Sequence, residues 1–188
     1  MKSILVATTN AGKLQEFRFL FKDLNVEILS LLDFPAVEIP KETGENFEEN
    51  AMIKANFYFK AFNIPVIVED SGFCVKELQN LPGVHSADWG INGDFSEGIS
   101  KIYEMLNGGK SEAFFVSVAV FKSAEKFEIS RGEVLGFVSE KARGANGFGF
   151  DACFIPHSCE KTFGEMTLEE KSRFSHRKIA IQNLLTKL

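Results

Sequence analysis

The segment Pro65–Gly72 constrains the fold of this chain more than any other. Its apolar run, Val66–Val68, is β-branched throughout, and the acidic pair Glu69–Asp70 follows directly. Such a run is typical of an interior strand of an α/β sheet rather than of a helix. Gly72 then allows a sharp change of direction, so we expect the strand to end at the acidic pair.

The acidic pair itself predicts a ligand site. The region just outside the carboxyl ends of strands is the usual binding place in α/β sheets. Glu69 and Asp70 repel each other, so they suit a divalent cation or a shared proton. The alternative is a solvated acidic turn, and this segment alone does not decide between the two.

The totals exclude several classes of protein. A chain of 188 residues is long enough for one sizeable core and short for two independent domains. Its net charge of −5 argues against nucleic acid or an anionic membrane as the main partner, although a small phosphorylated ligand needs only a few local cations. Three scattered cysteines argue against a disulfide framework or a zinc site. No apolar run is typical of a signal peptide or a membrane span, so we expect a cytoplasmic protein.

Apolar periodicity and capping residues predict an α/β chain with a mixed sheet. Asn10 and Asn46 stand where helix N-caps are expected. The two strands on either side of Ser123–Lys126 are expected to form an antiparallel hairpin. The expected strands are 3–8, 26–31, 65–68, 113–121, 127–138 and 153–155; the expected helices are 10–23, 46–62, 97–106 and a last one from Ser175, with Ile179, Leu184 and Leu188 on its inner face.

The segment Thr8–Lys13 predicts an anion site at a strand-to-helix turn. Backbone N–H groups at a helix start attract anions, and Lys13 adds a full positive charge. The segment is not a P-loop, because Ala7 and Leu14 stand where that motif has Gly and Ser or Thr. A capped helix with a surface lysine is the alternative.

A second candidate segment is Glu42–Gly44 with the helix that follows it. Asn50 and Lys54 are four residues apart and therefore share a helix face. A carboxylate in a glycine-flanked loop and a lysine in the next helix suit a metal ion and a phosphate respectively. The alternative is the ordinary polar face of a surface helix.

The glycine-rich segment Gly144–Asp151 predicts binding of a planar ring. Its glycines leave backbone amides open to close approach, Phe148 offers a ring for stacking, and Asp151 can accept a hydrogen bond from a ring N–H. A tight turn with buried rings is the alternative.

Cationic side chains gather near the start of the last helix. With Ser175 as the cap, His176 and Arg177 fall in its first turn, where the helix dipole prefers anions. This unfavourable placement hints at a ligand, while the charged run 169–178 lying in solvent is the alternative.

These segments, in this order, resemble the inosine triphosphate pyrophosphatase (Ham1-like) family, and the resemblance runs nearly from end to end. The motifs that carry it are T-x-N-x-G-K at Thr8–Lys13, ETG-x-x-F-x-ENA-x-x-KA at Glu42–Ala55, DSG at Asp70–Gly72, LPGV-x-SA at Leu81–Ala87, GFGFD at Gly147–Asp151 and KTFGE…EEKS…SHR at Lys161–Arg177.

The resemblance implies both a fold and an activity. The fold is an elongated two-lobed α/β domain around a mixed β-sheet with a substrate cleft between the lobes, formed by residues 1–188 as a single domain, and homodimers are common. The activity is Mg²⁺-dependent hydrolysis of non-canonical purine nucleoside triphosphates such as ITP, dITP and XTP to the monophosphate and pyrophosphate.

The resemblance also implies roles for individual residues. Asp70 acts as the base that prepares water for attack at the α-phosphorus, and Phe148 stacks on the purine. The phosphate-binding residues are Thr8, Thr9, Asn10, Ala11, Gly12, Lys13 and Lys54; the Mg²⁺ ligands are Glu42 and Asp70, with Glu69 as an auxiliary ligand; the other substrate contacts are Ser71, Gly149, Phe150, Asp151, Lys171, His176 and Arg177.

The chain departs from the family pattern at several positions. Asp88 stands where bacterial members usually carry arginine, which puts one phosphate contact in doubt. Phe150, Ala152 and Ser172 replace the usual tyrosine, proline and asparagine. Two other functions stay open: a Maf-like pyrophosphatase of other modified nucleotides, and a catalytically weak nucleotide-binding module.

Overall fold

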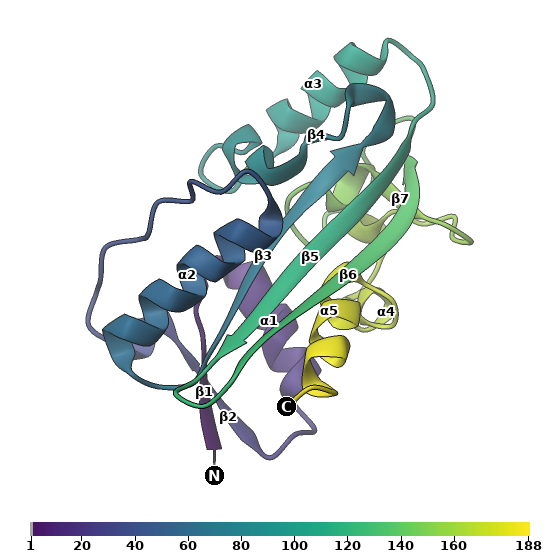
Figure 1. Ribbon diagram of the computed structural model, residues 1–188. Coiled ribbons are helices and arrows are strands. Elements are labelled where there is room, and N and C mark those ends of the chain that lie inside the picture. The colour runs from purple at the N-terminus through teal and green to yellow at the C-terminus, as the bar shows by residue number, and fades with distance from the viewer. Residues whose placement is uncertain (1) are drawn as a thin grey trace. The chain divides into compact units, whose positions relative to one another are not determined.

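The computed structural model describes residues 2–188 and has a seven-stranded mixed sheet flanked by helices (Figure 1). The strand order is β2-β1-β3-β5-β6-β7, with β4 beside β3. Strand β1 runs parallel to β2 and β3, whereas β3–β4 and β6–β7 are antiparallel pairs, so the predicted α/β fold with a mixed sheet is confirmed. The strands are β1 Lys2–Val6, β2 Val26–Ser30, β3 Val66–Val75, β4 Leu81–Pro82, β5 Glu112–Lys122, β6 Phe127–Val138 and β7 Phe154–Pro156.

The helices begin where the capping residues predict. The side chain of Asn10 accepts a hydrogen bond from Lys13 N (3.0 Å), and that of Asn46 accepts one from Glu49 N (2.9 Å). Each cap satisfies a backbone N–H that has no partner within its helix. The helices are α1 Ala11–Phe21, α2 Phe47–Phe62, α3 Ser96–Leu106, α4 Leu168–Ser172 and α5 His176–Leu185.

The expectation that the central strand ends at the acidic pair is wrong. Strand β3 continues through Gly72 to Val75, where it pairs with β4. Phe73, Cys74 and Val75 after the glycine are apolar and buried, and their burial holds the backbone extended past Gly72. Glu69 and Asp70 therefore lie within a strand, and consecutive strand residues point to opposite faces of the sheet.

The last helix also differs in detail. Leu188 lies beyond the end of α5 and is exposed, and Ile179 is only half-buried. The prediction is confirmed for Leu184, which is fully buried, and Ala180 and Ile181 complete the buried face. The short helix α4 has no counterpart among the expected elements.

The chain divides into two compact units, each with its own core. Unit 1 contains the described residues up to Asp70, Ser117–Gly132 and Arg177–Leu188. In it, apolar side chains of α1 and α5 pack against one face of the sheet, and α2 covers the other (Figure 1). The packed residues on the first face are Ile4, Val6, Phe17, Phe21, Ile67, Ala119, Phe121, Ala180, Ile181 and Leu184.

Unit 2 contains Ser71–Val116 and Glu133–His176, and its core is rich in phenylalanine. Phe73 lies at its centre, with ring centroids 4.9 Å from Phe115, 5.2 Å from Phe150 and 5.8 Å from Phe154. This aromatic packing holds β3, β5 and the segment after the glycine-rich loop together, which fixes the backbone on which several of the predicted site residues stand.

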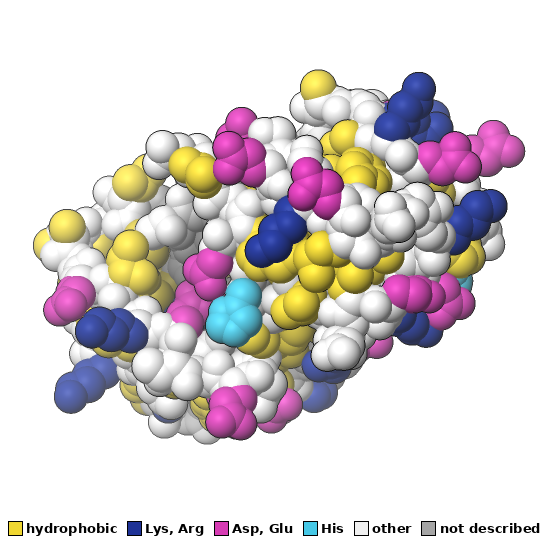
Figure 2. Space-filling model, turned by 90° about the horizontal axis from the view of Figure 1, so that it is seen from above, with side chains coloured by type: hydrophobic (Ala, Val, Ile, Leu, Met, Phe, Trp, Pro, Cys, Tyr) yellow, Lys and Arg dark blue, Asp and Glu magenta, His cyan; other side chains and the backbone are white. Residues whose placement is uncertain are grey.

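No helix within residues 2–188 is long and apolar enough to cross a membrane. Figure 2 shows one face of the molecule, on which acidic and basic side chains are interspersed and apolar ones gather in one area. The face shown carries no continuous basic surface of the kind that nucleic-acid binding needs.

Candidate functional site

Asp70 and Lys54 form the centre of a polar cluster in unit 1. Lys54 Nζ lies 2.6 Å from Oδ1 of Asp70 and 3.2 Å from Oε1 of Glu42. Strand β3 supplies the first carboxylate, the loop before α2 supplies the second, and the lysine comes from the third turn of α2. The loop carboxylate and the helix lysine that the sequence singles out are therefore in contact in the structure.

One oxygen of Asp70 is left without a partner. The carboxylate is 8 % exposed, and within residues 2–188 its Oδ2 atom is buried and makes no hydrogen bond. A buried polar atom without a partner is costly and is uncommon in folded proteins. Its presence next to a cation points to a position reserved for a ligand.

The electrostatics of this cluster favour a titratable carboxylate. Burial raises the pKa of Asp70 to about 6, although the charges of Lys54 and Lys13 act in the opposite direction. Burial alone would lower the pKa of Lys54, but the charges of Asp70 and Glu42 outweigh it and raise that pKa. The lysine is therefore a permanent cation, while Asp70 titrates near neutral pH.

Glu69 faces the other side of β3 and belongs to a different network. Its Oε1 accepts a hydrogen bond from Ser117 Oγ (2.7 Å) and lies 2.9 Å from Arg177 Nη2, and its Oε2 lies 3.2 Å from Lys13 Nζ. Arg177 also pairs with Glu16 of α1. The guanidinium is fully buried, and its two carboxylate partners raise its pKa against the effect of burial.

The predicted anion segment Thr8–Lys13 stands at the start of α1, next to this network. Thr8 Oγ1 accepts a hydrogen bond from Asn10 N (3.1 Å), which orders the turn before the helix. Thr9 and Asn10 are exposed, and Lys13 is half-buried. The turn thus presents the first backbone amides of an 11-residue helix, with Lys13 held in place by Glu69.

In unit 2 the predicted ring-binding residues form a second cluster. Asp151 Oδ2 accepts hydrogen bonds from Lys171 Nζ (2.6 Å) and from the backbone N of Phe148 (2.9 Å). The same ammonium lies 4.9 Å from the centre of the Phe148 ring. Gly147 has a φ of +76°, and a Cβ there would collide with the Asp151 carboxylate, so glycine is required for this turn.

This second cluster borders an open hollow of about 320 Å³, whose lining includes Phe148, Gly149 and Asp151. Its lining also includes Gly93–Ser96, just before and at the start of α3. The hollow therefore has an aromatic ring, open backbone amides and a carboxylate in its lining.

His176 and Phe150 are both placed by the aromatic core of unit 2. The His176 ring stacks on Phe115 with centroids 4.8 Å apart and planes 11° apart. Phe150 is buried and stacks on Phe73, so a role in substrate contact would require a rearrangement of this core. Ser71 is half-buried in β3.

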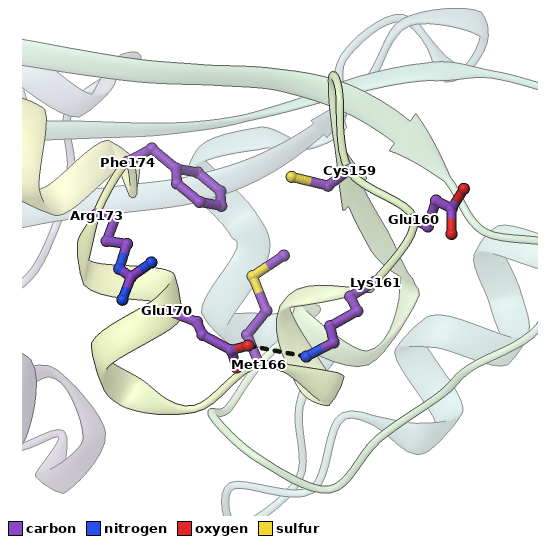
Figure 3. A pocket seen from close by; sticks show the side chains of 7 residues that line it. All are labelled: Cys159, Glu160, Lys161, Met166, Glu170, Arg173 and Phe174. Atoms are coloured by element: carbon purple, nitrogen blue, oxygen red, sulfur yellow. Dashed lines mark hydrogen bonds and ion pairs between the residues drawn. The ribbon is translucent and has the colours of Figure 1, made fainter.

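A further hollow of about 280 Å³ lies beside α4 (Figure 3). Figure 3 shows Cys159, Met166 and Phe174 lining it, with the ion pair between Lys161 and Glu170 at its edge (2.8 Å). None of the residues that the sequence singles out as ligand contacts lines this hollow.

Sequence reasoning missed Glu16 and Ser117 as members of the Glu69 network. Glu16 lies among apolar positions of α1, and a buried acidic residue on such a face is the only signal of it in the sequence. Ser117 lies within a buried stretch of β5 and gives no signal at all, because its partner is 48 residues away.

The fold and these clusters together define a class of protein. It is an α/β protein with a mixed sheet whose central strand carries a lysine-bound carboxylate on one face and a buried arginine–carboxylate network on the other. The sequence model described as the Ham1 family matches residues 4–187, and the chain therefore belongs to this family, as the resemblance predicts.

Curated relatives and solved structures agree with this assignment. A protein of Bacillus cereus named dITP/XTP pyrophosphatase is 40 % identical over 195 aligned positions, which cover 100 % of this chain and 95 % of the relative. One of the same name from Thermoanaerobacter pseudethanolicus is 37 % identical, covering 96 % and 93 %. The structure of the Staphylococcus aureus Ham1 protein has a TM-score of 0.86 at 33 % identity, and the match covers 99 % of this chain and 97 % of that one. The structure of a HAM1 protein from Coxiella burnetii has a TM-score of 0.86 at 34 % identity, and the match covers 100 % of both chains.

Proposed function

We propose that this protein hydrolyses non-canonical purine nucleoside triphosphates, such as dITP, XTP and ITP, to the monophosphate and pyrophosphate, with residues 1–188 acting as a single domain. The names of the full-length relatives support this substrate class. The observation that carries the proposal is the Asp70 carboxylate, which is held by Lys54 through one oxygen and has its other oxygen unpartnered.

The cluster around Asp70 fits Mg²⁺. The ion prefers hard oxygen ligands and is usually held by one or two carboxylates together with substrate phosphates. Glu42 and Asp70 would supply these carboxylates, and the orphaned Oδ2 atom is a suitable donor. When bound, the ion would offset negative charge on the phosphates.

We do not include Glu69 among the proposed metal ligands. Both of its oxygens already lie within hydrogen-bonding or ion-pair distance of Ser117, Lys13 and Arg177. Withdrawing the carboxylate from this buried network would leave Arg177 short of a counter-charge, which is expensive. Glu69 would instead position Lys13 and Arg177.

Asp70 would also act as the general base. A base is most effective when its pKa lies near the working pH, and burial brings the pKa of Asp70 to about 6. At pH 7 to 8 the group is therefore largely ionised and still basic enough to take a proton from an attacking water.

Unit 1 would bind the phosphates. Lys13 and Lys54 are cations already held in place by carboxylates, so little side-chain entropy would be lost when a phosphate binds. The segment Thr8–Gly12 adds the backbone amides at the start of α1, which favour anions.

Unit 2 would read the base. Phe148 would stack on the purine, with Gly149 allowing close approach, while Lys171 and His176 would face the 6-oxo oxygen as donors. An adenine presents an amino donor at this position, and an unpaired buried donor costs about 1–3 kcal/mol. Discrimination against ATP follows from this arrangement.

An assay of pyrophosphate release tests the proposal. With XTP, dITP, ITP, GTP, ATP and dTTP as substrates, we expect rapid turnover of the first three in the presence of Mg²⁺ and none in EDTA. Equal turnover of ATP and ITP would contradict the proposed specificity. Preference for dTTP would favour a Maf-like activity, and nucleotide binding without turnover would favour a binding module.

We further propose that the protein is a homodimer, as the family resemblance implies. Light scattering coupled to size-exclusion chromatography checks this directly. The expected mass is twice that of the 21.0 kDa chain, and a single-chain mass at micromolar concentration contradicts the proposal.

A further inference from the structure

We propose that unit 2 carries a second small-molecule site, separate from the residues assigned above, that binds a nucleoside monophosphate. The site is a half-open hollow of about 480 Å³ at the end of β6, within the size range of small-molecule pockets. Its lining residues are Lys110, Phe137, Val138, Ser139, Glu140, Lys141, Arg143 and Ile155.

The lining of this hollow includes apolar side chains, one of which is unusually exposed. Phe137 of β6 pairs with Ile155 of β7, and β7 is the last strand in the sheet order. The Phe137 side chain is 45 % exposed, although a ring of this size normally lies inside. Its ring lies against that of His157, with centroids 4.8 Å apart, and its exposed part offers apolar surface for another ring.

The lining also includes three cationic side chains. These are Lys110, Lys141 and Arg143, and Glu140 is the only carboxylate among the lining residues. In the described part of the chain neither Lys110 nor Lys141 has a salt-bridge partner, whereas Arg143 is held by Glu165 at 3.5 Å. In a chain of net charge −5, this local excess of positive charge favours binding of an anion.

Apolar and cationic side chains in one hollow suit a ligand that carries both a planar ring and a negative charge. A ligand with a single phosphate suits two unpaired lysines, and a planar ring suits the exposed face of Phe137. A nucleoside monophosphate has both groups joined by one sugar. The loop Ser139–Arg143 is anchored by backbone hydrogen bonds to Cys153 O (2.8 Å) and Ala152 O (2.8 Å), so this part of the lining is held by ordered backbone.

Equilibrium dialysis of the full chain with labelled inosine monophosphate tests this site. We expect two bound molecules per chain in the wild type. The double variant Lys110→Ala/Lys141→Ala should lose one of them, with at least tenfold weaker binding at that site, and should keep its rate of pyrophosphate release from dITP. The matched control Lys22→Ala/Lys60→Ala removes the same charge from exposed positions elsewhere and should keep both.

Three ligands separate the contributions to binding. Inosine, which lacks the phosphate, and ribose 5-phosphate, which lacks the ring, should each bind this site at least tenfold more weakly than inosine monophosphate. Phe137→Ala should abolish the difference between the nucleotide and ribose 5-phosphate. Unchanged binding of inosine monophosphate in the lysine double variant, or equal binding of ribose 5-phosphate and the nucleotide, would each overturn the proposal. If the proposed hydrolysis were absent, the count of bound nucleotide would still report on this site.

Discussion

Lys54 Nζ lies 2.6 Å from Oδ1 of Asp70, while Oδ2 of the same carboxylate is buried and has no hydrogen-bond partner within residues 2–188. The lysine thus fixes the orientation of the carboxylate through one oxygen and leaves the other for a ligand. Folding alone gives no reason to leave such an atom unpaired, since an unmade buried hydrogen bond is destabilising. This geometry underlies the first two predictions.

Substitution Asp70→Asn is expected to lower kcat for pyrophosphate release by roughly 10²–10⁴-fold, the usual contribution of a positioned base. The amide keeps the shape of the side chain but cannot accept the proton. The measurement is steady-state turnover of dITP, with circular dichroism to check the fold. The control is Asp23→Asn at an exposed position, which should keep wild-type activity. Activity of Asp70→Asn within twofold of the wild type would remove Asp70 from the proposed mechanism.

The same substitution is expected to change how stability depends on pH. The pKa of Asp70 is raised from 3.8 to about 6, so the folded protein favours the neutral form, and the stability contributed by this group is lost as pH rises through that window. The asparagine side chain is neutral at every pH. The free energy of unfolding of Asp70→Asn should therefore increase relative to that of the wild type as pH rises from 4 to 6. The gain is at most about 3 kcal/mol, the free-energy equivalent of a rise of about two pKa units.

Urea unfolding of both proteins between pH 4 and pH 8, in EDTA, measures this difference. A free-energy difference that is constant over the whole range would contradict the raised pKa. If the stability of Asp70→Asn relative to the wild type increased as pH falls, the pKa of Asp70 would be lowered by folding rather than raised.

Substitution Arg177→Met is expected to destabilise the protein by about 3–5 kcal/mol, the usual effect of breaking a buried ion pair. It would leave Glu16 and Glu69 buried without their shared guanidinium. Arg177→Lys keeps the positive charge but not the bidentate geometry of the guanidinium, and it should lose less stability than Arg177→Met. The measurement is the urea midpoint for each variant.

An exposed pair provides the control for that experiment. Arg173 and Glu169 lie 3.6 Å apart, and their side chains are 69 % and 73 % exposed. Arg173→Met should cost less than about 1 kcal/mol, as surface pairs do. Equal losses of stability for Arg173→Met and Arg177→Met would mean that the buried network stabilises the protein no more than the exposed pair does.

Substitution Lys171→Met is expected to weaken recognition of the base more than the chemical step. It removes the donor proposed for the 6-oxo group and leaves Asp151 without its cation. We expect KM for dITP to rise by about 5- to 150-fold, the equivalent of 1–3 kcal/mol, with a smaller change in kcat. Lys161→Met, at the exposed pair with Glu170, is the control and should leave KM unchanged.

Local features of this fold can be predicted from the sequence, and long-range ones cannot. Asn10 and Asn46 begin their helices as predicted, because capping is decided within four residues. Helix α4 also has a readable start, since the Thr167–Glu170 spacing is that of a capping box. The continuation of β3 past Gly72 depends instead on burial of Phe73 against distant aromatic residues, which no local pattern contains.

The candidate site shows the same division. The motifs identify Asp70, Lys54 and Lys13 as residues of interest, but not which carboxylate each lysine binds. The contact between Arg177 and Glu69 joins residues 108 positions apart, and that between Arg177 and Glu16 joins residues 161 apart. Only the folded chain reveals that Arg177 is committed to these two carboxylates.

The alternation of Glu69 and Asp70 along β3 has a consequence for insertions and deletions. Which carboxylate meets Lys54 and which meets Arg177 is decided by the phase of the strand, because a slip of one residue moves every side chain to the opposite face. Deleting Val68 would keep both acidic residues in the sequence but turn each of them to the opposite face of the sheet. The chemistry of this site is thus protected less by the identity of two adjacent acids than by the register in which β3 pairs with β1.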